Sequence, residues 1–299
     1  MLAEVRSIWP AAAVIVALSS CGLTSTPQAS SGKLEVVAAE NFWGSIAAQV
    51  GGDRVEVTSI IARPATDPHD YDPTANDARL IAGAGYFILN GAGYDPWAAR
   101  LAAANPVPGR RVLDVSVLAG VPDGGNPHMW YSPDIVAHVI GRITADLKRL
   151  DAGDAAYFDQ QGADYMTAGL NGYYDTIATI KRKYAGTPVG ASESIFAYMA
   201  PAVGLDLITP PGYMKAISEG ADPSAADKAT ADRQVTTGQV KVFVFNSQNS
   251  TPDVQGVVDK ARAAHIPVVQ ITETLSPAGA TFQDWQAGQL KALLAALGG

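Results

Sequence analysis

From Leu34 onward, short runs rich in β-branched residues alternate with stretches whose apolar residues recur at helical spacing. The first part of the chain predicts helices over residues 42–50, 77–84 and 96–104 between strands over residues 34–39, 55–61, 86–90 and 111–115. Strands separated by helices pair in parallel, because each crossover returns the chain to the same end of the sheet. We therefore expect an α/β sheet covered on both faces.

A long helical region is expected after this sheet. Ser132 is a favourable N-cap and Pro133 suits the first helical position, so a helix begins here and runs to about residue 150. Residues 152–184 then carry apolar side chains at mostly helical spacing. As one helix this stretch would be on the order of 50 Å long. A rod of that length can join two lobes stiffly.

The α/β pattern resumes after the rod. It predicts strands over residues 187–192, 205–208, 240–245 and 267–272, and helices over 195–203, 252–264 and 284–297, with a further helix beginning at 222–224. The fold class is therefore α/β, with two lobes of parallel-type sheets flanked by helices and joined by one long rigid helix. The expected boundaries are an N-terminal lobe over 34–150, a linking helix over 151–185 and a C-terminal lobe over 186–299.

The beginning of the chain has a different character. An apolar run over residues 11–18 follows Arg6 and is far shorter than the roughly 20 residues that span a bilayer, so residues 1–20 are interpreted as a signal peptide. Residues 18–21, Leu-Ser-Ser-Cys, resemble the lipobox of bacterial lipoproteins. The resemblance implies that Cys21 becomes the lipidated first residue of the mature chain.

The setting of Cys21 supports this interpretation. A buried core cysteine is the alternative, but serine and glycine surround Cys21 instead of a periodic apolar pattern. Residues 21–33 are rich in Ser, Thr, Pro and Gly, which is typical of a flexible tether. We expect an extracytoplasmic protein anchored to the bacterial cell membrane through lipid on Cys21.

Composition and charge narrow the set of partners. The chain has 299 residues, a net charge of −8 and one cysteine, so it contains no intramolecular disulfide. No cluster of Lys and Arg is long enough to follow a phosphate backbone, which argues against a nucleic-acid partner. The negative field raises the local concentration of cations, although many soluble proteins are acidic. We expect a monomer.

Two of the four histidines share an unusual context. His69 lies in DPHDYDPT and His128 in NPHMWYSP, each flanked by prolines that restrict the backbone. Both follow a strand or precede a helix, where loops at the carboxyl ends of parallel strands build ligand sites. A single loop histidine is usually a solvated side chain, but two matched Pro-His settings favour ligands. His138 and His265 lie among apolar neighbours in helical stretches and are interpreted as structural.

Together, the two Pro-His motifs, the long central helix and the lipobox resemble the cluster A-I family of ABC-transporter metal-binding proteins. The resemblance covers nearly the whole mature chain. It implies two α/β lobes bridged by a rigid helix, a metal held between them, and delivery to the permease of an ABC importer. In this family two N-lobe histidines are ligands, and His69 and His128 occupy those positions.

The resemblance also assigns two ligands in the second lobe. Glu193, in ASESIFAYM, occupies the position of the third ligand, and Glu273, after the last strand, that of the fourth. Taken alone, each glutamate would be a solvated surface carboxylate. Two imidazoles and two carboxylates can neutralise a divalent ion in a cleft, and they disfavour Cu(I), which selects sulfur.

The identity of the cargo stays open between two metals. Glu193 stands where zinc importers of this family more often have histidine, which shifts the donor set toward oxygen and toward Mn or Fe. The His-rich loop common in zinc members is absent. Zinc nevertheless binds such sites more tightly than Mn by the Irving–Williams order. The donor set favours manganese, with zinc beside it and iron as a further candidate.

The residues that orient the ligands also stay open. Each imidazole should donate its second N–H to a carboxylate or carbonyl, and Asp67, Asp70 and Asp72 are nearby candidates. Asn246 faces the same cleft by resemblance, but a turn residue at the end of a strand is an equally good interpretation.

Two other classes of metal-binding protein are alternatives to a transport protein. A metal-dependent hydrolase needs an open coordination position for water, and four protein ligands leave little room for it. Neither an H-E-x-x-H motif nor a G-x-S-x-G elbow is present, so we expect no enzyme. An adhesin or structural lipoprotein stabilised by metal would differ from a transport protein by unfolding when the metal is removed.

Overall fold

The computed structural model describes Met1, residues 32–63 and residues 71–299. The expected signal peptide, Cys21, nearly all of the tether and the loop that carries His69 lie outside the described residues. Within the described parts, no helix is both long and apolar enough to cross a membrane.

The first sheet contains four parallel strands in the order β2-β1-β3-β4. These are β1 (Leu34–Glu40), β2 (Val55–Ile61), β3 (Tyr86–Leu89) and β4 (Arg111–Asp114). In β1, Val36 and Ala38 join one hydrophobic cluster while Val37 and Ala39 join another, so both faces of the strand are buried. Alternate side chains of a strand point to opposite faces, and burial on both is what a parallel sheet between helices requires.

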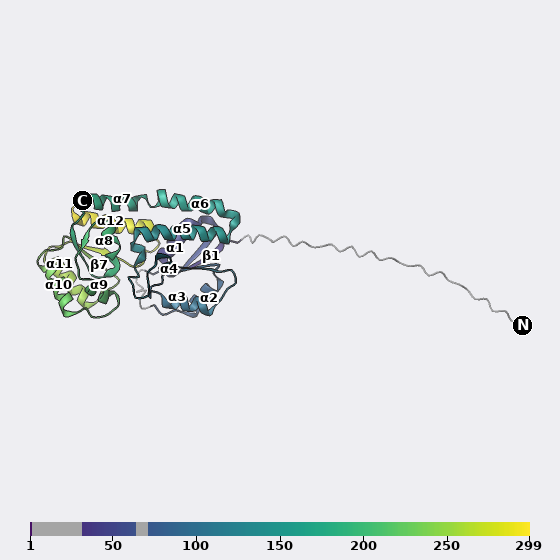
Figure 1. The fold of residues 1–299 in the computed structure, drawn as a ribbon, viewed down its shortest axis with the longest axis horizontal. Coiled ribbons are helices and arrows are strands. Elements are labelled where there is room, and N and C mark those ends of the chain that lie inside the picture. The colour runs from purple at the N-terminus through teal and green to yellow at the C-terminus, as the bar shows by residue number, and fades with distance from the viewer. Residues whose placement is uncertain (2–31, 64–70) are drawn as a thin grey trace. The chain divides into compact units, whose positions relative to one another are not determined.

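Helices cover both faces of this sheet (Figure 1). The cluster containing Val36 also holds residues of α1 (Asn41–Gly51) and α5 (Pro133–Leu150). The cluster containing Val37 holds residues of α2 (Ala75–Gly83) and α3 (Pro96–Ala104). A short helix that the sequence did not predict, α4 (Val115–Ala119), follows β4 directly and is capped by Asp114, whose side chain accepts from the N–H of Val117.

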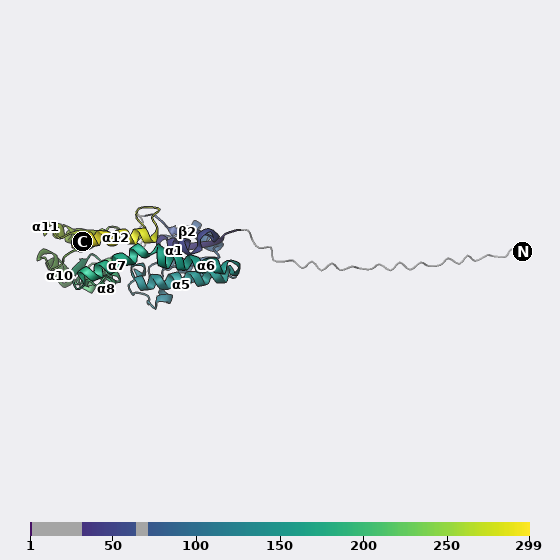
Figure 2. The same ribbon diagram turned by 90° about the horizontal axis from the view of Figure 1, so that it is seen from above.

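The connector between the lobes is present and has a break in its middle. After a 3₁₀ turn at Ala152–Asp154, α6 (Ala155–Asp164) and α7 (Asn171–Tyr184) are joined by a π-helical turn, Tyr165–Gly169. Helix α6 packs against α5 and α1, whereas α7 packs against α12 (Phe282–Leu297). The π turn therefore lies where the connector passes from one lobe to the other, as Figure 2 shows from above.

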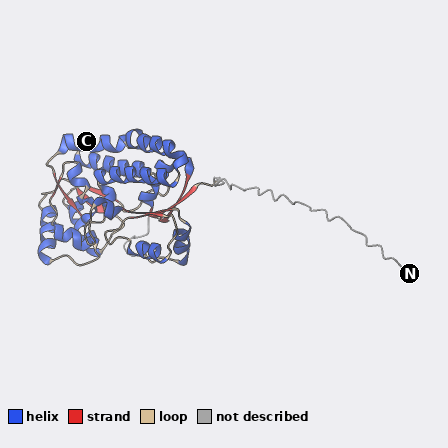
Figure 3. Cartoon of the chain, turned by 45° about the vertical axis from the view of Figure 1, so that its right-hand side comes forward, coloured by secondary structure: helices blue, strands red, loops and turns tan. Residues whose placement is uncertain are grey.

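The second sheet repeats the architecture of the first. Its parallel strands, in the order β6-β5-β7-β8, are β5 (Pro188–Ala191), β6 (Asp206–Leu207), β7 (Phe243–Asn246) and β8 (Val268–Ile271). Its helices are α8 (Met199–Ala202), α9 (Pro211–Ser218), α10 (Ala225–Thr236), α11 (Pro252–Ala263) and α12. Figure 3, coloured by secondary structure, shows strands in red with helices in blue around them. The α/β prediction with two sheets is therefore confirmed.

Two helices of the second lobe differ from the prediction. The helix expected over 195–203 is instead a 3₁₀ turn, Ser194–Ala197, followed by the short α8. Pro201 lies in this region and has no N–H to donate to a longer helix. Helix α9 was missed because Pro210, Pro211 and a glycine resemble a loop, although Pro211 occupies the first helical turn, where proline is tolerated.

The two lobes are packed against each other. One hydrophobic cluster contains side chains around both sheets, and backbone N–H groups of the second lobe bond to side chains of α1. The N–H of Leu275 donates to Asn41 Oδ1 at 3.2 Å, and that of Phe282 donates to Ser45 Oγ at 2.9 Å. The cleft between the lobes is therefore closed on the side of the connector and α12.

Candidate metal centre

His128 is placed by the first lobe, immediately before the 3₁₀ turn Met129–Tyr131. Its Nδ1 lies 2.8 Å from Asn126 Oδ1, while the Nδ2 of Asn126 donates to the carbonyl of Ser194 at 2.8 Å. Because Asn126 presents its oxygen to the ring, Nδ1 carries the proton and Nε2 carries the lone pair. The ring is also held edge-on against Trp130, with 5.3 Å between the ring centroids.

Glu193 follows β5 and precedes the 3₁₀ turn that begins at Ser194. Its Oε1 accepts a hydrogen bond from Asn246 Nδ2 at 2.8 Å, and its Oε2 accepts one from Asn249 Nδ2 at 2.7 Å. Asn246 ends β7, the strand next to β5, so neighbouring strands bring the amide and the carboxylate together. Both side chains are buried.

Glu273 follows β8 on the other side of β7. Its Oε1 accepts from the same Asn246 Nδ2 at 2.8 Å, and its Oε2 accepts from the hydroxyl of Tyr94 at 2.7 Å. Gln248 Oε1 accepts from the backbone N–H groups of Glu273 and Thr274, which fixes the loop. Asn246 thus donates one hydrogen to each glutamate, so of the two interpretations left open for this residue the contacts favour a place in the cleft.

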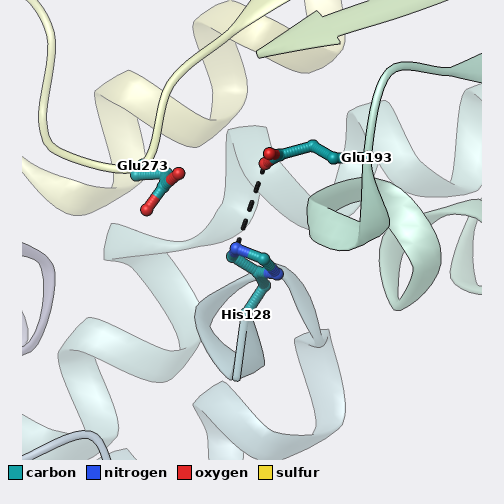
Figure 4. A group of neighbouring side chains, drawn as sticks. All are labelled: His128, Glu193 and Glu273. Carbon is teal, nitrogen blue, oxygen red and sulfur yellow. Dashed lines mark ion pairs between the residues drawn. The ribbon is translucent and has the colours of Figure 1, made fainter. Parts of the chain in front are cut away.

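The three predicted side chains that the structure describes meet in one place (Figure 4). One ligand atom each from His128, Glu193 and Glu273 lies within 4.8 Å of the others, and all three residues are fully buried. His128 Nε2 lies 4.0 Å from Glu193 Oε1. Donors bonded to one tetrahedral Zn²⁺ at about 2.1 Å would be about 3.4 Å apart. The 4.0 Å between His128 Nε2 and Glu193 Oε1 is therefore slightly longer than the distance between two donors that hold the same Zn²⁺ ion.

The charge of the cluster suits a divalent cation. The four carboxylate oxygens of Glu193 and Glu273 accept hydrogen bonds from two asparagines and one tyrosine. These donors are neutral, so they orient the carboxylates without neutralising them. Burying a carboxylate is costly unless a charge of the opposite sign compensates it. An imidazole nitrogen with two carboxylates is a donor set that Zn²⁺, Mn²⁺ and Fe²⁺ accept.

The remaining sequence predictions have different outcomes. His69, the other expected N-lobe ligand, lies outside the described residues, as do Asp67 and Asp70. His138 and His265 are exposed, and neither belongs to the cluster. The expectation of apolar surroundings is therefore wrong, because both residues are exposed, and the interpretation of the two histidines as structural stays a prediction.

Three polar residues of the centre were not predicted from the sequence. They are Tyr94, Asn126 and Asn249, which contact Glu273, His128 and Glu193, respectively. Two of them had a local signal: Asn126 stands two residues before His128, and Asn249 lies just after the end of β7. Tyr94 had none, because its partner is distant in the sequence.

A cavity of about 500 Å³ adjoins the cluster and is lined by both lobes. Its walls include Tyr94, Asn126, Ser194 and Asn249. All four of these side chains lie within hydrogen-bond distance of a residue of the cluster. The cavity therefore reaches the groups that orient the three donors.

A second pair of acidic side chains, Glu40 and Asp95, is buried in the first lobe. Glu40 ends β1 and is fully buried against Asp95, and burial together with the nearby Asp95 charge raises the pKa of Glu40 well above its ordinary value. Burial also raises the pKa of Asp95 to about 6. Burial therefore opposes the ionisation of both carboxyl groups.

The fold and the buried cluster together define a class: a two-lobed metal-binding protein. The chain belongs to the family described as zinc-uptake complex component A periplasmic, whose model matches residues 36–296. Members of this family are metal-binding solute-binding proteins of metal uptake systems and are not enzymes.

Individual relatives are distant in sequence. The chain is 25% identical over 211 residues to the manganese-binding lipoprotein MntA of Halalkalibacterium halodurans, covering 65% of this chain and 67% of the relative. It is 23% identical to the high-affinity zinc uptake system protein ZnuA of Bacillus subtilis, covering 78% of each. A Mn-bound mutant of a periplasmic metal-binding protein from Candidatus Liberibacter asiaticus shares the fold, with a TM-score of 0.75, 20% identity, and coverage of 89% of this chain and all of the other.

Proposed function

We propose that this chain captures one divalent transition metal between its lobes and delivers it to the permease of an ABC importer. The ligands are His69, His128, Glu193 and Glu273. The observation that carries the proposal is the convergence of the last three, from both lobes, into one fully buried cluster. Membership in a family of solute-binding proteins supports the transport role.

The proposed protein is anchored to the membrane by its N-terminal region and has two lobes. Residues 1–20 serve as a signal peptide, Cys21 carries the lipid anchor, and residues 21–33 tether the body to the membrane surface. The lobes comprise residues 34–150 and 186–299, with the connector between them. A relative named a manganese-binding lipoprotein supports an anchor of this kind.

The proposed cargo is Mn²⁺ or Zn²⁺. One relative is named for manganese and another for zinc, so sequence similarity to these relatives supports either metal. Two carboxylates in the donor set favour Mn²⁺. By the Irving–Williams order, however, Zn²⁺ binds more tightly than Mn²⁺ to almost any such site. The metal that the protein carries when isolated from its own host identifies the cargo.

Removal of the metal separates transport from a structural role. We expect chelator-treated protein to keep its circular dichroism spectrum and to rebind one ion per chain, because the sheets are held by strand pairing and the core that joins the lobes consists of apolar side chains. Titration calorimetry with Mn²⁺ and Zn²⁺ gives the stoichiometry. Unfolding on removal would favour a metal-stabilised adhesin or structural lipoprotein, and absence of binding would refute both.

A further inference from the structure

We propose that Tyr94 is a positioning residue that ties the ligand Glu273 of the second lobe to the first lobe, so that metal binding depends on the docking of the lobes. The inference rests on the proposed metal site. The Tyr94 hydroxyl donates to Glu273 Oε2 at 2.7 Å, and both side chains are buried. The two residues are 179 positions apart in sequence.

The first lobe holds Tyr94 in a defined position. Gly91, Ala92 and Gly93 have φ values of 76°, 55° and 81°, which form a tight left-handed turn between β3 and α3. A residue with a Cβ, such as Ala92, rarely adopts this conformation, and strain of this kind gathers at functional positions. The Asp95 carboxylate holds the turn by accepting from the N–H groups of Asn90 and Gly91 at 2.7 and 2.8 Å.

The ring of Tyr94 also contacts the metal centre from its own lobe. It packs edge-on against His128, with 6.2 Å between the ring centroids, and lies 5.1 Å from the ring of Trp130. One side chain thereby touches a proposed ligand of each lobe, His128 through the ring and Glu273 through the hydroxyl. This arrangement couples the position of one ligand to that of the other.

Glu273 is held from the second lobe at its other oxygen. Asn246 donates to Oε1, so the carboxylate is oriented by one donor from each lobe. When the lobes separate, Tyr94 withdraws its hydrogen bond while Asn246 stays with the glutamate. The metal then loses a correctly oriented ligand together with the first-lobe histidines. Partners that orient metal ligands typically contribute 10- to 100-fold in affinity.

The test compares Tyr94→Phe with Tyr131→Phe in the full chain. Tyr131 is also a buried residue of the first lobe, and its hydroxyl donates across the lobes to the backbone carbonyl of Thr272 at 2.8 Å. We expect Tyr94→Phe to weaken the binding of Mn²⁺ by about 10- to 100-fold and to change the absorption spectrum of bound Co²⁺. Tyr131→Phe should keep the affinity and spectrum of the parent.

A double-mutant cycle shows whether Tyr94 acts through Glu273. In a Glu273→Gln background, Tyr94→Phe should cause no further loss of affinity. A parent-like Tyr94→Phe variant, an equal loss in Tyr131→Phe, or a full additional loss in the double variant would each overturn this role while leaving the proposed function intact. A parent chain that binds no metal would overturn the proposed function and this inference together.

Discussion

Replacing Glu193 with glutamine is expected to weaken the binding of both Mn²⁺ and Zn²⁺ about a thousandfold. The change preserves the shape of the side chain and an oxygen that can accept from Asn249 or Asn246, but it removes one negative charge from a fully buried cluster. A unit charge about 4 Å away contributes about 4 kcal/mol at an effective dielectric constant of 20. Each 1.4 kcal/mol is a factor of ten in affinity.

Competition against a chelator of known affinity measures this loss. Glu219→Gln is the matched control, because Glu219 lines the neighbouring cavity, where its exposed carboxylate pairs with Lys215. Exposed charges are screened by salt and contribute little. The control should therefore bind like the parent. A Glu193→Gln variant within tenfold of the parent, or an equal loss in the control, would argue against Glu193 as a ligand.

Replacing Glu40 with glutamine is expected to stabilise the metal-free protein at neutral pH. Because the pKa of Glu40 is raised, the folded chain keeps this proton to a higher pH than the unfolded chain, in which the group ionises at its ordinary value. Folding must therefore take up a proton, which costs about 1.4 kcal/mol for each pH unit above the ordinary value while the carboxyl stays protonated. Glutamine removes this cost and can donate an N–H to Asp95.

The stability difference between the Glu40→Gln variant and the parent should grow as the pH rises. A carboxyl whose pKa is raised by folding lowers stability as the pH rises above the unfolded value, so the variant and the parent should be similar near pH 4. By pH 7 the variant should be clearly more stable than the parent. Urea unfolding in the presence of chelator measures it. Glu35→Gln, an exposed residue near the start of the same strand, serves as the control. A variant less stable than the parent at pH 7 would show that Glu40 is ionised in the fold.

Most of the architecture could be predicted from the local pattern of apolar residues, because strands and helices each impose their own periodicity on that pattern. Strand β2 and helix α3 were predicted at their observed bounds, and both sheets were anticipated as parallel. The π turn Tyr165–Gly169 was not predicted, because its apolar residues keep an approximately helical spacing on either side. What distinguishes this turn is its position between two lobes, which is a property of tertiary packing.

The ligands and the groups that orient them differed in how far the sequence could reveal them. His128 had a restrictive Pro-His setting, whereas Glu193 and Glu273 were assigned through family resemblance, since a glutamate at a strand end is ordinary. The polar partners were harder to find. Tyr94 resembles any aromatic residue at the start of a helix until the fold brings it to Glu273. Hydrogen bonds between segments that are distant in the sequence produce no local pattern of residues, so they cannot be predicted from such a pattern.

The connector bears on how the metal is released. A stiff helix permits only a modest change in lobe spacing. The π turn lies between α6, which packs on the first lobe, and α7, which packs on the second. Release in the proposed cycle then requires only a small movement of the second lobe that carries Glu193 and Glu273 away from the histidines. Similar lobe spacing with and without metal is compatible with this, and a large rigid-body swing would contradict it.

The central claim is that one divalent metal is bound by two residues of each lobe. The most direct measurement is the anomalous scattering of crystals of the Mn²⁺-loaded protein, collected at the manganese absorption edge. The account predicts one strong peak between the lobes, bonded to His69 and His128 nitrogens and to Glu193 and Glu273 oxygens. A peak elsewhere, or an ion at this position bonded to neither glutamate, would contradict it.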